Sequence, residues 1–130
     1  MKSNEREIIE TLNNHTKETL LETPYQYAPY DAYNSNKIVE VKDRNRFYKQ
    51  VLVEFNKFSY NITYCEIHKK RFYYAVRMEN VVYLFDMKDL YKEKYDFNWE
   101  WRQLPKQTEF KDTEDIMKYV GYVNIDKCIR

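Results

Sequence analysis

A turn signal followed directly by a strand signal is the feature that most constrains how this chain folds. Residues 34–36, Asn-Ser-Asn, have the composition of a tight turn, and residues 37–42 alternate as a β-strand does. The alternation places Glu40 and Lys42 on the same face of the strand. If the turn closes a hairpin, residues whose numbers sum to about 70 or 71 lie opposite each other. Asp31 is then expected beside Glu40 or the residue before it, so that two carboxylates converge.

An amphipathic helix is predicted at the start of the chain. Ser3 or Asn4 is expected to cap it, and it should end near the Asn13-Asn14 pair, since apolar residues recur between them at helical spacing. At roughly 100° per residue, Glu5 falls within the apolar stripe, whereas the later glutamates of the helix fall on the opposite side. Glu5 is therefore the acid that we expect to face the core.

Periodicity predicts a mixed order of helices and strands in the rest of the chain. Residues 17–21 are expected to prolong the first helix or to form a turn, and the tyrosine-rich residues 25–33 to form an irregular strand. The remaining predicted elements are a strand at 50–54, a helix at 55–69, a hairpin of 71–78 with 81–86, an extended aromatic segment at 95–101 and a last strand at 117–125. This order predicts an α/β fold with a central mixed β-sheet flanked by helices.

The chain has the size and composition of one globular domain. It has 130 residues, 43% of them hydrophobic, and a net charge of +1, so residues 1–130 are expected to share a single core. No stretch approaches the roughly 18 apolar residues of a membrane-spanning helix, and Cys65 and Cys128 lack the spacing of a zinc site. We therefore expect a cytoplasmic, intracellular protein with reduced thiols, found in the host cytoplasm if it is viral. Neither a membrane nor a nucleotide cofactor is expected as a partner.

The nearly neutral charge conceals a basic centre. Residues 37–71 contain nine Lys or Arg against four Asp or Glu, so the rest of the chain is acidic. A basic stretch within a neutral protein predicts an anionic partner such as a phosphate backbone, although a solvated rim of Lys and Arg explains the same pattern. If DNA is the partner, the expected contacts come from Arg44, Arg46, Lys49, Lys57, Lys69, Lys70 and Arg71.

A helix glutamate, a hairpin aspartate and an E-x-K triplet follow one another as Glu5, Asp31, Glu40 and Lys42. In this order they resemble the PD-(D/E)XK, or restriction-endonuclease-like, nuclease superfamily. Within it, the pattern is most similar to the archaeal-type Holliday junction resolvases, and the later Val-Glu-Phe-Asn-Lys at 53–57 resembles an element of small nucleases of phages and mobile elements. The resemblance implies a restriction-endonuclease-like core and a metal-dependent DNA endonuclease, with branched DNA such as Holliday junctions among its substrates.

The chemistry of phosphodiester hydrolysis accounts for these residue types. Mg²⁺ or Mn²⁺ neutralises charge on the phosphoryl oxygens and acidifies a water, and Mg²⁺ typically takes one or two protein carboxylates. Asp31 and Glu40 would share that cation, with Glu5 completing the ligand sphere from the helix. Lys42 would hold or deprotonate the attacking water, and Lys57 would contact the scissile phosphate or support the water.

Other interpretations are open from the sequence alone. Glu40 and Lys42 would form an ordinary ion pair if their sheet face is exposed, with Asp31 a turn residue. The chain would otherwise be a non-catalytic nucleic-acid-binding module, or a structural or interaction protein whose interface is the aromatic segment 95–101. Core and rim positions are favoured over base stacking for the tyrosines of 25–33. For a nuclease, a homodimer is one possible assembly, because one small subunit has one metal site and cutting two strands needs two.

Overall fold

The computed structural model describes residues 1–25, 27–105 and 115–129. Its main sheet has five strands in the order β1-β2-β3-β5-β6. The strands are β1 (Leu21–Glu22), β2 (Ala32–Tyr33), β3 (Lys37–Arg44), β5 (Arg71–Met78) and β6 (Val81–Asp86). The β3 and β5 strands run parallel and the other neighbours antiparallel, which confirms the predicted mixed sheet.

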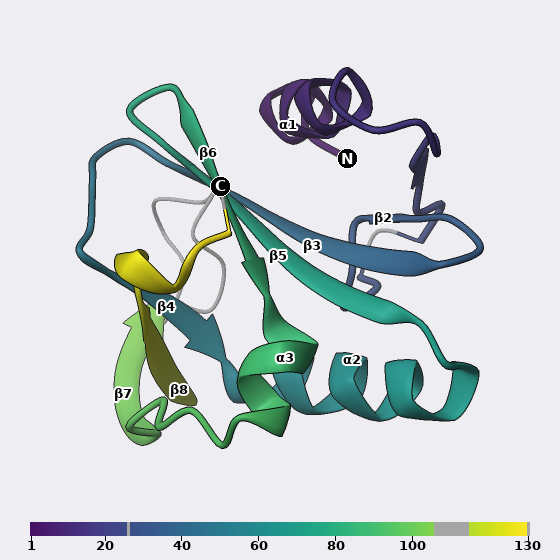
Figure 1. Cartoon of the computed structure of the whole chain (residues 1–130). Coiled ribbons are helices and arrows are strands. Elements are labelled where there is room, and N and C mark those ends of the chain that lie inside the picture. The colour runs from purple at the N-terminus through teal and green to yellow at the C-terminus, as the bar shows by residue number, and fades with distance from the viewer. Residues whose placement is uncertain (26, 106–114, 130) are drawn as a thin grey trace.

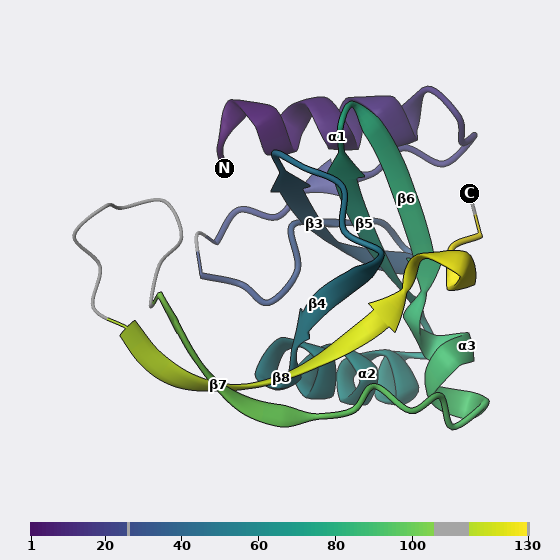
Figure 2. The same cartoon turned by 90° about the vertical axis from the view of Figure 1, so that its left-hand side faces the viewer.

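Helices cover both faces of this sheet, as the α/β prediction requires. Figures 1 and 2 show α1 (Ser3–Asn13) on one face, and α2 (Phe55–His68) with the short α3 (Met87–Lys92) on the other. The β3 strand lies between these layers, so both of its faces are buried. Val39 and Val41 pack with Ile8 and Ile9 of α1, whereas Ile38 belongs to the larger core that includes residues of α2. Glu40 and Lys42 therefore occur on a covered face.

Three strands form a second sheet that the sequence did not predict as a separate unit. They are β4 (Gln50–Glu54), β7 (Glu100–Pro105) and β8 (Asp115–Asn124), in the order β4-β8-β7, and the short η1 (Ile125–Lys127) follows β8. Figure 2 shows β7 and β8 as a long ribbon that passes beneath α2. Glu54 at the end of β4 is paired with Val120 of β8. This pairing brings the C-terminal third of the chain against the start of α2.

Two predicted hairpins are present, and the residues of each turn explain why the chain reverses there. The Asn34 side-chain oxygen accepts hydrogen bonds from the backbone N–H groups of Asn36 (2.8 Å) and Lys37 (3.0 Å), which is an Asx-type turn. The resulting pairing of Ala32 with Val39 confirms the predicted register. Between β5 and β6, Glu79 (φ 49°) and Asn80 (φ 67°) are both left-handed, as the favoured two-residue hairpin turn requires.

The helix α1 ends at Asn13, as predicted, but its start differs from the prediction. Ser3 is the first helical residue and no side chain caps the helix; Asn4 instead donates a 2.8 Å hydrogen bond to Asp43 of β3. Residues 17–21 do not prolong the helix, because the Asn13 side chain bonds both the N–H (2.8 Å) and the carbonyl (3.2 Å) of Leu20. The chain turns back there and enters β1.

Two predicted extended segments are shorter than expected. In the tyrosine-rich residues 25–33 the regular strand is confined to Ala32–Tyr33, and residue 26 lies outside the described part. The aromatic segment 95–101 becomes a strand at Glu100, because Asn98 adopts a left-handed φ of 56°. Phe97 is buried, whereas Trp101 is 64% exposed, so the segment does not present one aromatic face.

None of the helices in the described ranges has both the length and the apolar character needed to cross a membrane.

Candidate active site

The carboxyl group of Glu40 is buried in the middle of β3. The residue is 4% exposed, and its face of β3 also carries the apolar side chain of Ile38 and that of Lys42. Its ion-pair partner is Lys57 of α2, whose Nζ lies 4.0 Å from Oε2. Burial raises the pKa of Glu40 to about 7, although the charges of Lys57 and Lys42 act in the opposite direction. An acid held this way, in an apolar layer beside cations, is typical of a functional site.

Asp31 lies beside β3, because it directly precedes β2, the antiparallel neighbour of β3. Its N–H donates to the carbonyl of Val39 (2.8 Å), and its Oδ2 accepts a 2.7 Å hydrogen bond from the N–H of Val41. Burial has the largest effect on the pKa of Asp31 and raises it. The hydrogen bond from the Val41 N–H lowers this pKa, and the charge of Glu5 raises it further. Asp31 and Glu40 also act on each other, since the Asp31 charge raises the pKa of Glu40.

Two lysines supply positive charge to this acid pair. Lys42 shares the strand face of Glu40, and burial lowers its pKa first, with the charge of Lys57 lowering it further. The pKa of Lys57 is also lowered by burial, but the carboxylates of Glu40, Glu54 and Asp31 outweigh that effect and raise it overall. Lys57 is therefore harder to deprotonate than an ordinary lysine, whereas Lys42 loses its proton more readily.

Glu5 approaches the group from α1. The side chain is half-buried, whereas Glu10 is exposed, which agrees with the predicted helix phase. Its charge raises the pKa values of both Asp31 and Lys57. The structure thus brings Glu5, Asp31, Glu40, Lys42 and Lys57 within electrostatic reach of one another, and we call this group the acid–lysine cluster.

Two further residues join the acid–lysine cluster without having been predicted as site residues. Glu54 lies 3.7 Å from Lys57 Nζ through Oε2 and 3.0 Å from Lys118 Nζ through Oε1. Burial raises the pKa of Glu54, but Lys57, Lys118 and Lys42 together lower it below its usual value. The Glu-x-x-Lys spacing of Glu54 and Lys57 was a usable signal. No local sequence pattern indicated Lys118, because only the pairing of β8 with β4 brings it to the acid–lysine cluster.

The predicted DNA-contacting residues fall at separate places around the sheet. Arg44, Arg46 and Lys49 lie at and beyond the end of β3, whereas Lys69, Lys70 and Arg71 lie at the opposite end, where β5 begins. Lys57 is part of the acid–lysine cluster itself. The basic centre of the sequence is therefore not one continuous patch in space.

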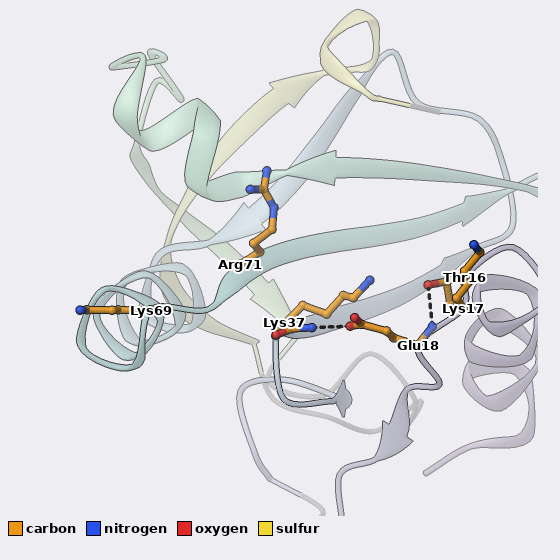
Figure 3. A pocket seen from close by; sticks show the side chains of 7 residues that line it. Thr16, Lys17, Glu18, Lys37, Lys69 and Arg71 are labelled. Carbon is orange, nitrogen blue, oxygen red and sulfur yellow. Dashed lines mark hydrogen bonds between the residues drawn. The ribbon is translucent and has the colours of Figure 1, made fainter.

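The second of these basic regions borders an open hollow of about 580 Å³. Its lining includes four cationic side chains, from Lys17, Lys37, Lys69 and Arg71, and one acidic side chain, from Glu18. Figure 3 shows Lys17, Glu18 and Lys37 close together, while Lys69 extends away from the end of α2. Lys37 is on the β3 face opposite Glu40, so this basic hollow is distinct from the acid–lysine cluster.

The donor set of the acid–lysine cluster fits a hard divalent cation. In the ranges that the structure describes, no group of three or more His, Cys, Asp or Glu side chains converges as a ready-made metal cluster. Mg²⁺ does not need one, because it is usually bound by one or two carboxylates with water and phosphate oxygens. Asp31 and Glu40 supply two such carboxylates, and a cation beside them would offset the cost of burying their charge. The residues present therefore fit Mg²⁺ or Mn²⁺.

As a class, the fold is an α/β domain with a mixed sheet between helices. Among the solved structures with a similar fold is Hjc, a Holliday junction resolvase from the archaeal hyperthermophile Archaeoglobus fulgidus. The two share a TM-score of 0.54 at 12% sequence identity, over 94% of this chain and 84% of that one. At this identity the likeness establishes the fold. No protein-family model and no curated protein sequence matches the chain.

Proposed function

We propose that this protein is a Mg²⁺- or Mn²⁺-dependent DNA endonuclease of the PD-(D/E)XK type that acts on branched DNA such as Holliday junctions. The observation that carries the proposal is the burial of Glu40 beside Lys57 and within electrostatic reach of Asp31, with its pKa raised to about 7. A structural ion pair does not need two carboxylates crowded into an apolar layer, because burying charge without full compensation is destabilising. A divalent cation and a phosphate would supply the missing compensation.

Asp31 and Glu40 would hold the cation, with Glu5 behind them. When bound, the cation supplies positive charge against the phosphate oxygens and makes a nearby water more acidic. Lys42, with its lowered pKa, is suited to position this water and to take its proton. The water oxygen then bonds to phosphorus as the bond to the leaving sugar oxygen breaks, and that oxygen takes a proton from solvent. Lys57 favours the ionised form of Glu40 and would face the phosphate as a fixed cation.

Branched DNA is proposed as substrate on the fold likeness to a Holliday junction resolvase together with the separated basic regions. Arg44, Arg46 and Lys49 lie at one end of the sheet, and the basic hollow at the other, so DNA arms leaving the site in different directions would meet cations. We further propose that the active form is a homodimer, because cutting both sides of a junction requires two sites.

The test is a cleavage assay with the purified full chain on a four-way junction, linear duplex, single-stranded DNA and RNA. Each substrate is incubated with Mg²⁺, Mn²⁺ or EDTA, and an Asp31→Asn variant prepared in parallel controls for contaminating nucleases. We expect metal-dependent cleavage of the junction by the wild type alone. Binding without cleavage of any substrate would favour the non-catalytic module, and neither binding nor cleavage would favour a structural protein.

A further inference from the structure

A row of contacting aromatic rings runs along α2 away from the acid–lysine cluster. Tyr60 and Tyr64 are stacked, with ring centroids 6.3 Å apart and planes 14° from parallel, and the Tyr64 ring lies 4.3 Å from that of His68. Tyr30, on the segment before β2, contacts Tyr64 at 5.8 Å. We call Tyr30, Tyr60, Tyr64 and His68 the tyrosine ladder.

The tyrosine ladder is attached directly to the candidate site. Tyr30 immediately precedes Asp31 in the chain, and Tyr60 is about one helical turn beyond Lys57. The segment that carries Tyr30 is fixed to α2 by Asn61, whose side-chain amide donates a 3.0 Å hydrogen bond to the carbonyl of Pro29. Asn61 is fully buried, so this junction is part of the folded core. A strand whose phosphate lies at Asp31 would therefore have these rings beside it.

Exposure distinguishes the ladder from ordinary core aromatics. Tyr60 is 53% exposed and His68 is also exposed, although Tyr30 and Tyr64 rest partly on the core. Tyr25 and Tyr27, on the segment leading to Tyr30, are 77% and 84% exposed. Several aromatic side chains exposed to water on one stretch of the surface indicate that this surface binds a partner.

The charges around the ladder indicate what that partner is. Lys70 Nζ lies 5.8 Å from the centre of the Tyr64 ring and is held by a 3.1 Å hydrogen bond to the carbonyl of Asn34. Lys57 flanks the other end, while Glu66, the acid on this stretch of α2, is within 4.0 Å of Lys88. Ring faces bordered by fixed cations match a single nucleic-acid strand, whose bases stack while its phosphates meet the lysines. A protein partner with an apolar surface would offer the Lys70 ammonium group no anion.

We propose that the tyrosine ladder binds unpaired bases of DNA next to the strand that enters the acid–lysine cluster. The inference rests on the proposed nuclease function and specifies its substrate: DNA with unpaired or displaced bases at the cleavage position. A continuous duplex keeps its bases stacked internally, so it cannot use the ladder. Unpaired bases at a branch, gap or flap can.

The test compares DNA binding by the wild type, Tyr60→Ala and Tyr60→Phe in Ca²⁺ without Mg²⁺. The probes are a fully paired duplex and a duplex of the same length with a short single-stranded gap that carries 2-aminopurine. Tyr60→Ala should weaken binding to the gapped probe about tenfold, the size expected for one base–aromatic stack, and leave the paired duplex unchanged. Tyr60→Phe keeps the ring and should bind as the wild type does. The wild type should quench the 2-aminopurine fluorescence, and Tyr60→Ala should quench it much less.

Equal binding of both probes by the wild type, or equal loss on both for Tyr60→Ala, would overturn the inference. A change in self-association of Tyr60→Ala, measured by light scattering, together with unchanged gap binding would assign the ladder to a protein interface instead. Failure of the nuclease proposal is separately visible: a wild type that quenches the gap probe but cuts nothing in Mg²⁺ or Mn²⁺ supports the ladder and contradicts catalysis.

Discussion

The backbone N–H of Val41 donates a 2.7 Å hydrogen bond to Oδ2 of Asp31. Val41 is the middle residue of the Glu-Val-Lys triplet, so this bond orients the Asp31 carboxylate from the peptide that joins Glu40 to Val41. The Asp31 carboxylate is therefore positioned by the backbone of β3 between Glu40 and Lys42, its proposed functional partners. Small movements of β3 would shift all three together.

This hydrogen bond makes Asp31→Asn a clean test of charge. An asparagine oxygen can still accept from Val41, so the fold should be retained while the charge of one proposed metal ligand is lost. Cleavage should fall by more than about 100-fold, the upper end of what loss of a supporting residue costs a metal site. DNA affinity measured in Ca²⁺ or EDTA should stay level or rise, because a negative charge near the phosphate is gone.

A wild-type cleavage rate in Asp31→Asn would exclude Asp31 as a ligand. Circular dichroism and thermal unfolding of the variant serve as controls, since a misfolded variant would lose binding as well as cleavage.

The raised pKa of Glu40 makes stability depend on pH in a defined direction. Its pKa is about 7 in the folded chain against a usual value of 4.5, so folding favours the protonated form. In metal-free buffer, stability from this group should therefore fall as pH rises from about 4.5 through about 7, and then level off. Glu40→Gln should remove this dependence, gaining roughly 3 kcal/mol relative to the wild type between pH 4.5 and pH 8. Urea unfolding at several pH values in EDTA measures it.

Glu54→Gln is the matched control, because the pKa of Glu54 is lowered rather than raised. An acid with a lowered pKa adds stability above its unfolded pKa, and that contribution is lost as the pH falls through the lower folded value. Glu54→Gln should thus lose stability relative to the wild type at neutral pH. Parallel pH profiles for the two variants would contradict the assigned shifts.

Lys57→Ala should affect both DNA binding and the pH dependence of cleavage. Loss of a cation facing the phosphate should lower the salt dependence of DNA affinity by about one counterion. Without Lys57, the pKa of Glu40 rises further, so metal-dependent cleavage should need a higher pH. Binding across a salt series and cleavage between pH 6 and pH 9 are the measurements.

Lys69→Ala separates these two effects, because Lys69 is exposed at the end of α2 and remote from Glu40. It should lower the salt dependence without moving the pH profile of cleavage. A shifted pH profile in Lys69→Ala would show that the shift in Lys57→Ala is not specific to the acid–lysine cluster.

Gly121→Ala should destabilise the second sheet. A Cβ at Gly121 would lie 2.7 Å from Cε3 of Trp99 and 2.8 Å from Cβ of Phe97, which is closer than atoms can approach. We expect a loss of about 1–3 kcal/mol in the free energy of unfolding, typical of overpacking. In a Trp99→Leu background the added methyl group has more room, so Gly121→Ala should cost less there. Equal costs in both backgrounds would contradict a clash with the indole.

Local signals account for the parts of the fold that were predicted. Asn34 both directs the turn and fixes the register, and the left-handed Glu79-Asn80 pair closes a hairpin whose strands alternate clearly. The order of helices and strands and the mixed sheet followed from such signals. The failures have long-range or side-chain causes: Asn4 bonds Asp43 of β3 instead of capping α1, and Asn98 interrupts the aromatic strand. Neither effect is visible in hydrophobic periodicity.

The candidate site, like the fold, has some features that local sequence patterns predict and others that they do not. The shared face of Glu40 and Lys42, and the inward phase of Glu5, follow from the periods of a strand and a helix. The burial of Glu40 does not, because it depends on α2 and the second sheet covering that face of β3. That these residues hold a metal and cut DNA stays a prediction.

The pairing of β4 with β8 also has a consequence for protein synthesis. Lys118 on β8 bonds Glu54 at the start of α2, but the ribosome adds β8 long after β4 and α2 have emerged. In the growing chain, the carboxylates around Lys57 therefore lack one of their cations, and β4 has no partner strand. Assembly of the acid–lysine cluster is thus delayed until β8 has been made, so a ribosome-bound or prematurely terminated chain would not yet have the charges of this cluster balanced.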